Sequence, residues 1–409
     1  MAFHALFLPA FEGPDEAQHL ARVMDFARRP LSEAFQGRWV DADIVGSVVS
    51  HPCPSPEIGC PPYGTTPAAF NLLRGAPRPP ARSVRRIPND EAKQPPLFYL
   101  LAGLPLRLAG GNPTPPAALL YVRLLSVGLV SLALFGPLKR FANRSPVAAT
   151  AGLIAMLSPG AAEAFARCSN DAAVFLWAAA VLASLDRKPG TLPMVVLIAA
   201  GPMIKLTALP VVVFAVIVLW TEKRRAAAVT GAAASALIFP IQALRGWVSG
   251  GALELQRRAP EVVESLGDGL LGFARSVYAM VKMAFWAMGW SVHHPPSALV
   301  GLYFALLLFA VLAVRIRSPP RRLPAHVCAA FAVAAGFSVF VVAGRRALGV
   351  WGYVTGWYLW DWSPWLLASS SDLFTIDRRF VRPLLMAEAL FVLVANGVWL
   401  TVARARYGW

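Results

Sequence analysis

The apolar residues of the chain gather into long blocks, and this pattern limits the possible folds more than any other feature. Several blocks approach the about 20 residues that an α-helix needs to cross the hydrocarbon of a bilayer. They lack the strict alternation of transmembrane β-barrel strands. Since 57% of the residues are hydrophobic and 15% are charged, the chain is too apolar for an ordinary soluble protein. We therefore expect an all-α polytopic membrane protein with about ten or eleven transmembrane helices. The blocks are 117–137, 147–165, 171–186, 191–220, 226–244, 297–315, 325–343 and 383–403.

Lys and Arg are concentrated in the short loops between these blocks. Clusters of this kind are typical of cytoplasmic loops. The net charge of +16 therefore indicates membrane topology and not a nucleic-acid partner. The clusters are KRFANR (139–144), DRKPG (186–190), TEKRR (221–225), RIRSPPRR (315–322) and DRRF (377–380).

Assigning all five clusters to the cytoplasm leaves two long segments outside the membrane. Loops of such length are usually functional or separately folded. The path of 350–375 stays open, because Asp361 and Pro364 interrupt it. We expect a single integral membrane domain: the end of a first transmembrane helix (1–10), a first external loop (11–116), transmembrane helices (117–244), a second external loop (245–296) and C-terminal transmembrane helices (297–409).

Both external segments contain apolar stretches that suit a membrane surface better than a membrane span. Residues 93–110 are interrupted by a Pro and an Arg, and 276–290 is rich in Met and Trp with one Lys. We expect both to form interfacial helices. The first segment also holds Cys53 and Cys60, in HPCPSPEIGCPP. An oxidising exterior permits a disulfide there, which we favour over free thiols and over a zinc site.

The stretch FEGPDEAQHLAR (11–22) puts two carboxylates and a histidine beside the first span. Pro14 followed by Asp15 and Glu16 is a typical start of a helix, where acids contribute about 0.3–1 kcal/mol through the helix dipole. A partly desolvated carboxylate is instead suited to act as a general base. His19 follows Asp15 by four residues and is within side-chain reach on a helix. A divalent metal held by Asp15, Glu16 and His19 is also left open.

Several motifs, in their order along the chain, resemble those of the GT-C superfamily of membrane glycosyltransferases. FEGPDEAQHLAR resembles the PDE-x-x-H signature of a group of predicted bacterial membrane proteins in that class. EAKQPPLFYLL (91–101) is similar to an element of protein mannosyltransferases and of lipid A aminoarabinose transferases. Some of those have a Lys or His directly before the Pro pair, where this chain has Gln94, with Lys93 one residue earlier. Further similar stretches are RCSNDAAVFL (167–176), GPMIKLTALP (201–210), in which a turn joins two short helices, and KMAFWAMGW (282–290).

The resemblance implies transfer of a sugar from a polyprenyl-phosphate donor to an acceptor hydroxyl, with inversion. The acceptor would be a glycan, a lipid or a protein, and the reaction would take place on the outer face of the bacterial cytoplasmic membrane. By position, Asp15 is the expected general base and Glu16 the second catalytic candidate. Candidates for binding the sugar or acceptor are His19, Gln94, Tyr99, Asn170, Asp171, Trp286 and Trp290.

The departing lipid phosphate is an anion, so a cation is needed at the lipid–water boundary. Lys205 attracts attention because it lies inside the apolar block 191–220, where charge is costly. That block is long enough for two short, broken spans. Arg123 is expected to extend to lipid headgroups, and Asn170 and Asp171 also fit a helix cap. The phosphate-binding candidates are Lys93, Arg167, Lys205, Arg345 and Arg346.

Two other functions stay open from the sequence. One is a transporter or flippase of a lipid-linked sugar. Such proteins usually have repeated halves and ionisable residues near the midplane, whereas this chain shows no repeat. The other is a non-catalytic protein of envelope-polysaccharide assembly. The resemblance leads us to expect a Gly-Arg-Tyr (GRY) element near the last helices, and neither 344–353 nor 356–364 matches it well. The sequence names neither the sugar nor the acceptor.

Overall fold

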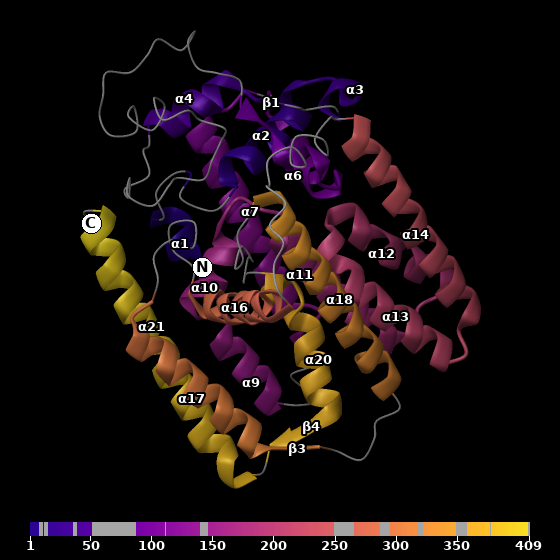
Figure 1. Cartoon of the computed structure of the whole chain (residues 1–409). Helices are drawn as coiled ribbons and strands as arrows, with labels where there is room; N and C mark the ends of the chain where they lie inside the picture. The colour runs from indigo at the N-terminus through magenta and orange to yellow at the C-terminus, as the bar shows by residue number, and fades with distance from the viewer. Residues whose placement is uncertain are drawn as a thin grey trace.

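The computed structural model describes the chain apart from residues 8–10, 12–14, 36–38, 51–86, 111, 140–145, 249–265, 287–294, 317–321, 349–357, 377 and 408–409. The described residues are mostly helical, as the apolar blocks predict. The helices, labelled as in Figure 1, are α1 (Ala2–Phe7), α2 (Glu16–Arg28), α3 (Leu31–Ala34), α4 (Ala42–Ser50), α6 (Leu97–Leu108), α7 (Pro115–Phe135), α9 (Pro146–Ala155), α10 (Pro159–Ala166), α11 (Asp171–Arg187), α12 (Thr191–Ile204), α13 (Leu209–Thr221), α14 (Arg225–Val248), α16 (Leu266–Phe285), α17 (Ser297–Ala313), α18 (Leu323–Leu348), α19 (Tyr358–Asp361), α20 (Ser363–Leu373) and α21 (Arg378–Tyr407), with the short 3₁₀ helices η2 (Asp90–Lys93) and η3 (Leu206–Ala208).

Two helices are long and apolar enough to cross a membrane among the residues described, namely α7 and α21. A third span is possible in length and composition if α9 and α10 are counted together, although the two are bent by 74° at their junction. Six more helices are apolar but shorter, with bounds within α6, α12, η3–α13, α14, α17 and α18. The chain is therefore compatible with association with a bilayer.

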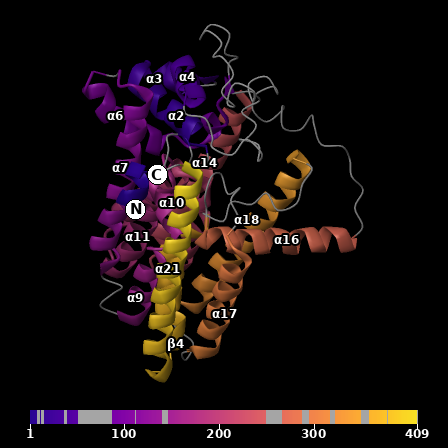
Figure 2. The ribbon, with the colours of Figure 1, turned by 90° about the vertical axis from the view of Figure 1, so that its left-hand side faces the viewer.

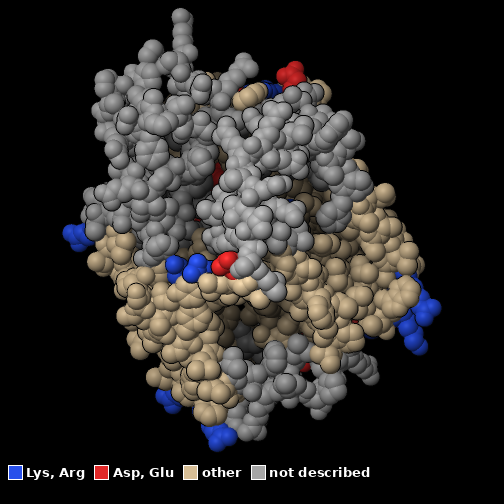
Figure 3. All heavy atoms as spheres, in the orientation of Figure 1, with Lys and Arg blue, Asp and Glu red and all other residues tan. Residues whose placement is uncertain are grey.

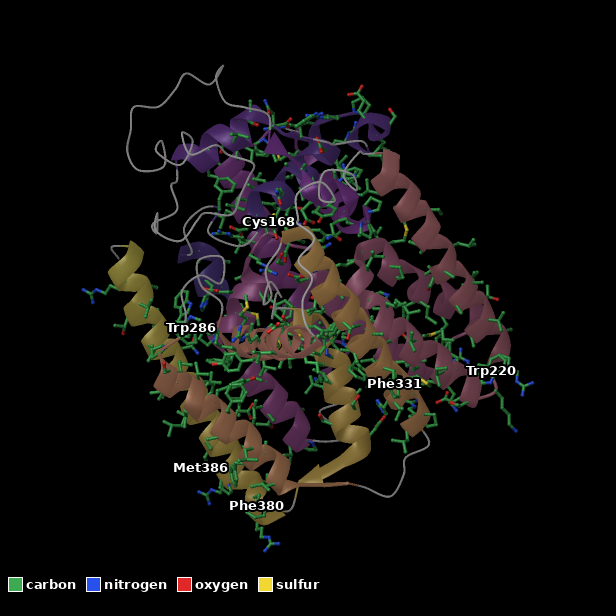
Figure 4. The ribbon with its side chains drawn as sticks, viewed as in Figure 1. Cys168, Trp220, Trp286, Phe331, Phe380 and Met386 are labelled. Carbon is green, nitrogen blue, oxygen red and sulfur yellow. The ribbon has the colours of Figure 1, made fainter. Side chains whose placement is uncertain are left out.

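The outward faces of these helices carry large apolar side chains. Phe135 is 82% exposed and Phe331 is 72% exposed, and Phe331, Trp220 and Met386 lie on the outer surface in Figure 4. In Figure 3 the visible described surface of the lower half has few charges, with Lys and Arg at its edges. Soluble monomers rarely expose so much contiguous apolar surface, which marks a lipid or protein contact.

Four of the five basic clusters meet at one end of the molecule. Arg322 lies 3.2 Å from Asp186 and 3.0 Å from Glu222, through NH1–Oδ1 and NH2–Oε1. These contacts tie the starts or ends of α11, α13 and α18 together. The strand β3 (Val314–Ile316) pairs antiparallel with β4 (Phe374–Ile376), which brings the loop after α17 beside the start of α21 (Figure 1). The described parts of these clusters are therefore held together in two groups, one around Arg322 and one at the β3–β4 pair.

The α2 end lies opposite this basic end (Figure 1). Here α2 packs on α6 and is bordered by α3, α4 and the pair β1 (Trp39–Val40) with β2 (Ile87–Pro88), which is antiparallel. Gly103 allows the close approach of α6 to α2, because an added Cβ would lie 2.7 Å from the carbonyl oxygen of Val23. Figure 2 shows α16 running across the direction of α17 and α21, as a helix along a membrane surface would.

The structure departs from the predicted elements in two places. Block 147–165 is not one helix but α9 and α10, because Ser158 accepts a hydrogen bond from the Ala161 N–H and Pro159 starts a new helix. Proline in a first turn is favourable, whereas inside a helix it removes a hydrogen bond. The open segment 350–375 contains α19, α20 and β4. The two short β-ladders also depart from an all-α chain, although each strand has only two or three residues.

Candidate functional site

Asp15 directly precedes α2 in a left-handed conformation, with φ of 58°. Aspartate enters this region more readily than most residues do. Asp15 occupies the N-cap position of α2 and Glu16 its first turn, as the sequence predicts, but the Asp15 side chain makes no capping hydrogen bond to α2.

Glu16 is fully buried and is held on both carboxylate oxygens. Arg123 of α7 donates from Nε to Oε1 at 2.8 Å and from NH2 to Oε2 at 2.5 Å. The backbone N–H of Cys168 donates to Oε1 at 2.9 Å. Arg123 is 3% exposed, so the prediction that it extends to lipid headgroups is wrong. This paired contact anchors the first turn of α2 to α7 and to the chain before α11, where Figure 4 labels Cys168.

A second group connects α2, η2 and α6. The Nδ1 atom of His19 lies 2.7 Å from the hydroxyl of Tyr99, and that hydroxyl donates to Oε2 of Glu91 at 3.0 Å. Burial raises the pKa of Glu91 to about 8, with the charge of Asp15 adding to the effect. Burial lowers the pKa of His19 to about 3. Burial thus favours the neutral form of each group, and Nδ1 of His19 lies 3.4 Å from Oε2 of Glu91.

Lys205 occupies a break between two apolar helices. α12 ends at Ile204, Lys205 has extended backbone with φ of −164°, and η3 leads into α13. This confirms the prediction that 191–220 is two short helices. The Lys205 ammonium binds Asp171 and lies 3.5 Å from Oδ2 of Asp361.

Asp171 is shared between two cations at the start of α11. Arg167 and Lys205 both pair with it, and the hydroxyl of Ser169 donates to its Oδ2 atom at 2.9 Å. Asn170 is the N-cap residue but makes no side-chain cap; its Nδ2 donates to the Ile204 carbonyl at 3.2 Å. Asn170 thus occupies the N-cap position predicted for it, but its side chain does not cap the helix. Arg167 and Lys205 share Asp171, and Lys205 also lies beside Asp361.

Sequence reasoning missed Asp361 as a site residue. It is fully buried, and its Oδ2 accepts a hydrogen bond from the hydroxyl of Thr207 at 2.7 Å. The neighbouring Trp362 donates from Nε1 to the Thr207 carbonyl at 2.7 Å, which attaches α19 to the Lys205 turn. Burial raises the pKa of Asp361 to about 7. The available signal was an Asp between two Trp in an apolar stretch, since a carboxylate there needs a partner. Glu91 was missed as well, although it begins the quoted motif at 91–101.

Five separate segments thus contribute to one polar cluster. The charges of Asp171, Lys205 and Arg167 all act on the pKa of His19, and those of Asp15 and Lys205 act on that of Glu91. We call this set the polar cluster; it comprises Asp15, His19, Glu91, Tyr99, Arg167, Asn170, Asp171, Lys205, Thr207 and Asp361. Of the helices that carry it, α2 and α6 lie at the end of the molecule away from β3 and β4 (Figure 1).

The remaining candidates are not brought into this cluster by the described contacts. Trp286 is buried in a separate apolar cluster with Phe285, Leu299 and Phe391. Gln94 ends η2 and is half-buried, with its N–H donating to the Glu91 carbonyl at 3.0 Å. The side chains of Lys93, Arg345, Arg346 and Trp290, and both Cys53 and Cys60, lie outside the described part of the chain.

The polar cluster is a set of paired charges and neutral hydrogen-bonding groups. Among the described residues, no group of three or more His, Cys, Asp or Glu is arranged to hold a metal ion. Glu16 in particular is already neutralised by Arg123. No protein-family model matches the chain, and no curated protein or solved structure is significantly similar to it.

Proposed function

We propose that the chain is a membrane glycosyltransferase that moves a sugar from a polyprenyl-phosphate donor to an acceptor hydroxyl. The reaction would take place at the outer face of a bacterial cytoplasmic membrane. Asp15 is the general base, and transfer proceeds with inversion of the sugar. The convergence of four motif-bearing segments on one buried polar cluster is the observation that carries this proposal.

The chemistry follows from the charges of the cluster. Asp15 directly precedes α2, and its charge acts on the pKa of buried Glu91, which places it beside the polar cluster; a base must reach the acceptor proton. Attack by the acceptor oxygen on the anomeric carbon breaks its bond to the phosphate oxygen, and the proton passes to Asp15. The lipid phosphate leaves as an anion, which the Arg167 guanidinium and the Lys205 ammonium would stabilise.

Glu16 has a positioning role in this proposal. Its carboxylate is already saturated by Arg123 and by the Cys168 N–H. If Glu16 accepted a proton, the buried Arg123 guanidinium would lose the charge that neutralises it, at a cost of about 3–5 kcal/mol. Asp15 is therefore the better base, although the two residues are adjacent.

Purified protein in lipid nanodiscs tests the reaction. The donors would be polyprenyl phosphates carrying radiolabelled hexoses or pentoses, and the acceptors would be glycan, lipid and protein fractions of bacterial envelopes. Asp15→Asn should lower the rate of label transfer by at least about 100-fold, the usual contribution of a general base. Asp43→Asn changes an acid of the same external region that pairs with Arg28, so it is the matched control and should keep its rate.

Two results would contradict the proposal. Transfer by Asp15→Asn at the unchanged rate removes Asp15 as the base. Movement of labelled lipid across the membrane of sealed vesicles, with no transfer to any acceptor fraction, identifies a flippase.

A further inference from the structure

Two buried oxygen atoms on either side of the Lys205 turn accept no hydrogen bond from any described residue. They are Oδ1 of Asn170 and Oδ1 of Asp361. Both side chains are fully buried. A buried acceptor without a donor costs about 1–3 kcal/mol, and such groups in folded proteins usually have a partner.

The partner atoms of these side chains fix where the two oxygens lie. The Nδ2 atom of Asn170 is bound to the carbonyl of Ile204, directly before Lys205. The Oδ2 atom of Asp361 is bound to Thr207, directly after Leu206, and lies 3.5 Å from the Lys205 ammonium. Both free oxygens therefore belong to side chains attached to one turn of four residues, 204–207.

The charges around the turn restrict what can satisfy these atoms. Two acceptor oxygens require hydrogen-bond donors, which disfavours a phosphate or a carboxylate. A cationic donor is not needed, because Arg167 and Lys205 already pair with the carboxylates at this turn. A neutral hydroxyl fits both conditions. A group that carries several hydroxyls next to a phosphate matches the adjoining cations as well.

We propose that Asn170 and Asp361 form a subsite that binds two hydroxyl groups of the donor sugar. This inference rests on the proposed function, since it assumes a lipid-phosphate sugar as the ligand. Asp361 is a specificity-determining residue in this assignment: it selects sugars with a hydroxyl at one ring position, and Asn170 selects for a second hydroxyl.

Binding measurements test the subsite without any need for turnover. The probes are one polyprenyl phosphate in three forms, bearing no sugar, a hexose, or each monodeoxy version of that hexose, with glucose, galactose and mannose tried in turn. The change in tryptophan fluorescence of the protein in nanodiscs gives each dissociation constant. The preferred hexosyl lipid should bind more tightly than the bare lipid. Removal of a recognised hydroxyl should weaken binding by about 10- to 100-fold.

In Asp361→Asn the amide oxygen keeps the hydrogen bond from the Thr207 hydroxyl. The amide NH2 group, a donor, then takes the place of the acceptor Oδ1. This variant should bind the hexosyl lipid about 10- to 100-fold more weakly, and one monodeoxy lipid should then bind as well as the hexosyl lipid. Asn170→Ala should also weaken binding of the hexosyl lipid, and the monodeoxy lipid that then binds equally well should lack a different hydroxyl. Asp372→Asn, an identical change at an aspartate bound to His326, is the control and should change nothing. Binding of the bare lipid reports that each variant is folded.

The subsite is overturned if the bare, hexosyl and deoxy lipids bind equally or not at all, or if both variants keep the selectivity of the natural chain. In those cases water alone satisfies the two oxygens. Hydroxyl-selective binding without transfer would support the subsite and contradict the glycosyltransferase. Transfer that is indifferent to Asp361→Asn and to Asn170→Ala would contradict the subsite alone.

Discussion

Asp15 and Glu16 are neighbours in sequence, and Glu16 is enclosed by an ion pair with Arg123. Glu16→Gln keeps an acceptor for the Cys168 N–H but removes the negative charge that neutralises the buried Arg123. We expect it to destabilise the fold by about 3–5 kcal/mol. Glu16→Gln with Arg123→Met should recover most of the thermal stability, since a buried pair can be replaced by neutral groups at little cost.

The double variant also separates positioning from catalysis. If Glu16 only positions Asp15, Glu16→Gln with Arg123→Met should retain measurable transfer, in contrast to Asp15→Asn. Thermal unfolding in detergent and the transfer assay are read on the same preparations. A double variant that is stable but as inactive as Asp15→Asn would make Glu16 a catalytic residue.

Glu91 gives the cluster a stability that depends on pH. Its folded pKa of about 8 lies above the ordinary value of 4.5. Between these values the unfolded chain loses a proton that the folded chain retains, so the contribution of Glu91 to stability falls as pH rises. Glu91→Gln cannot ionise, and it should raise the melting temperature relative to the natural chain at about pH 9 but hardly at about pH 5.

Melting curves of both proteins across this range measure the difference. A constant difference at every pH would mean that Glu91 ionises normally in the folded chain. Glu33→Gln changes an exposed acid of α3 and serves as the control, with no dependence of its effect on pH.

The sequence identifies a residue as a site candidate where a short stretch around it has an unusual composition. Asp15, Asn170, Asp171 and Lys205 stand in such stretches. Arg123 was misjudged and Asp361 was missed because their partners, Glu16 and Lys205, are far away in sequence. Packing of α7 against the start of α2 pairs Arg123 with Glu16 and keeps it from lipid headgroups. Packing of α19 against the Lys205 turn brings Asp361 to Lys205.

At the scale of elements, five apolar blocks agree with the helices to within about four residues at each end: 117–137 with α7, 171–186 with α11, 191–220 with α12 and α13, 226–244 with α14, and 297–315 with α17. The break at Lys205 was predictable because a charge near the middle of a long apolar block favours two short helices. The break between α9 and α10 has an equally local cause, the Ser158–Pro159 helix start. It was missed because apolar residues continue on both sides of this pair. The pairing of β3 with β4 could not be predicted, because it joins residues about sixty positions apart and depends on where α17 and α20 end.

For the whole molecule, the polar cluster and the basic loops lie at opposite ends of a body with an apolar surface. The Arg322 contacts with Asp186 and Glu222 hold three basic loops together. If the apolar surface faces lipid, the two ends are on different sides of the membrane. The proposed reaction requires the α2 end to be outside, where polyprenyl-linked sugars and their acceptors would meet.

Cysteine labelling tests this orientation. In a parent with Cys53, Cys60 and Cys328 changed to Ser, Ser32→Cys adds a thiol to exposed α3, and Lys223→Cys adds one to the basic end. The remaining Cys168 is buried. A membrane-impermeant maleimide applied to intact spheroplasts should label Ser32→Cys and not Lys223→Cys, and detergent should make Lys223→Cys reactive. Labelling of Lys223→Cys alone in intact spheroplasts would reverse the orientation, and labelling of both would mean that the apolar body does not separate two compartments. Either result would contradict the outside location of the polar cluster. It would also contradict the proposed transfer from a polyprenyl-phosphate sugar, which depends on that location.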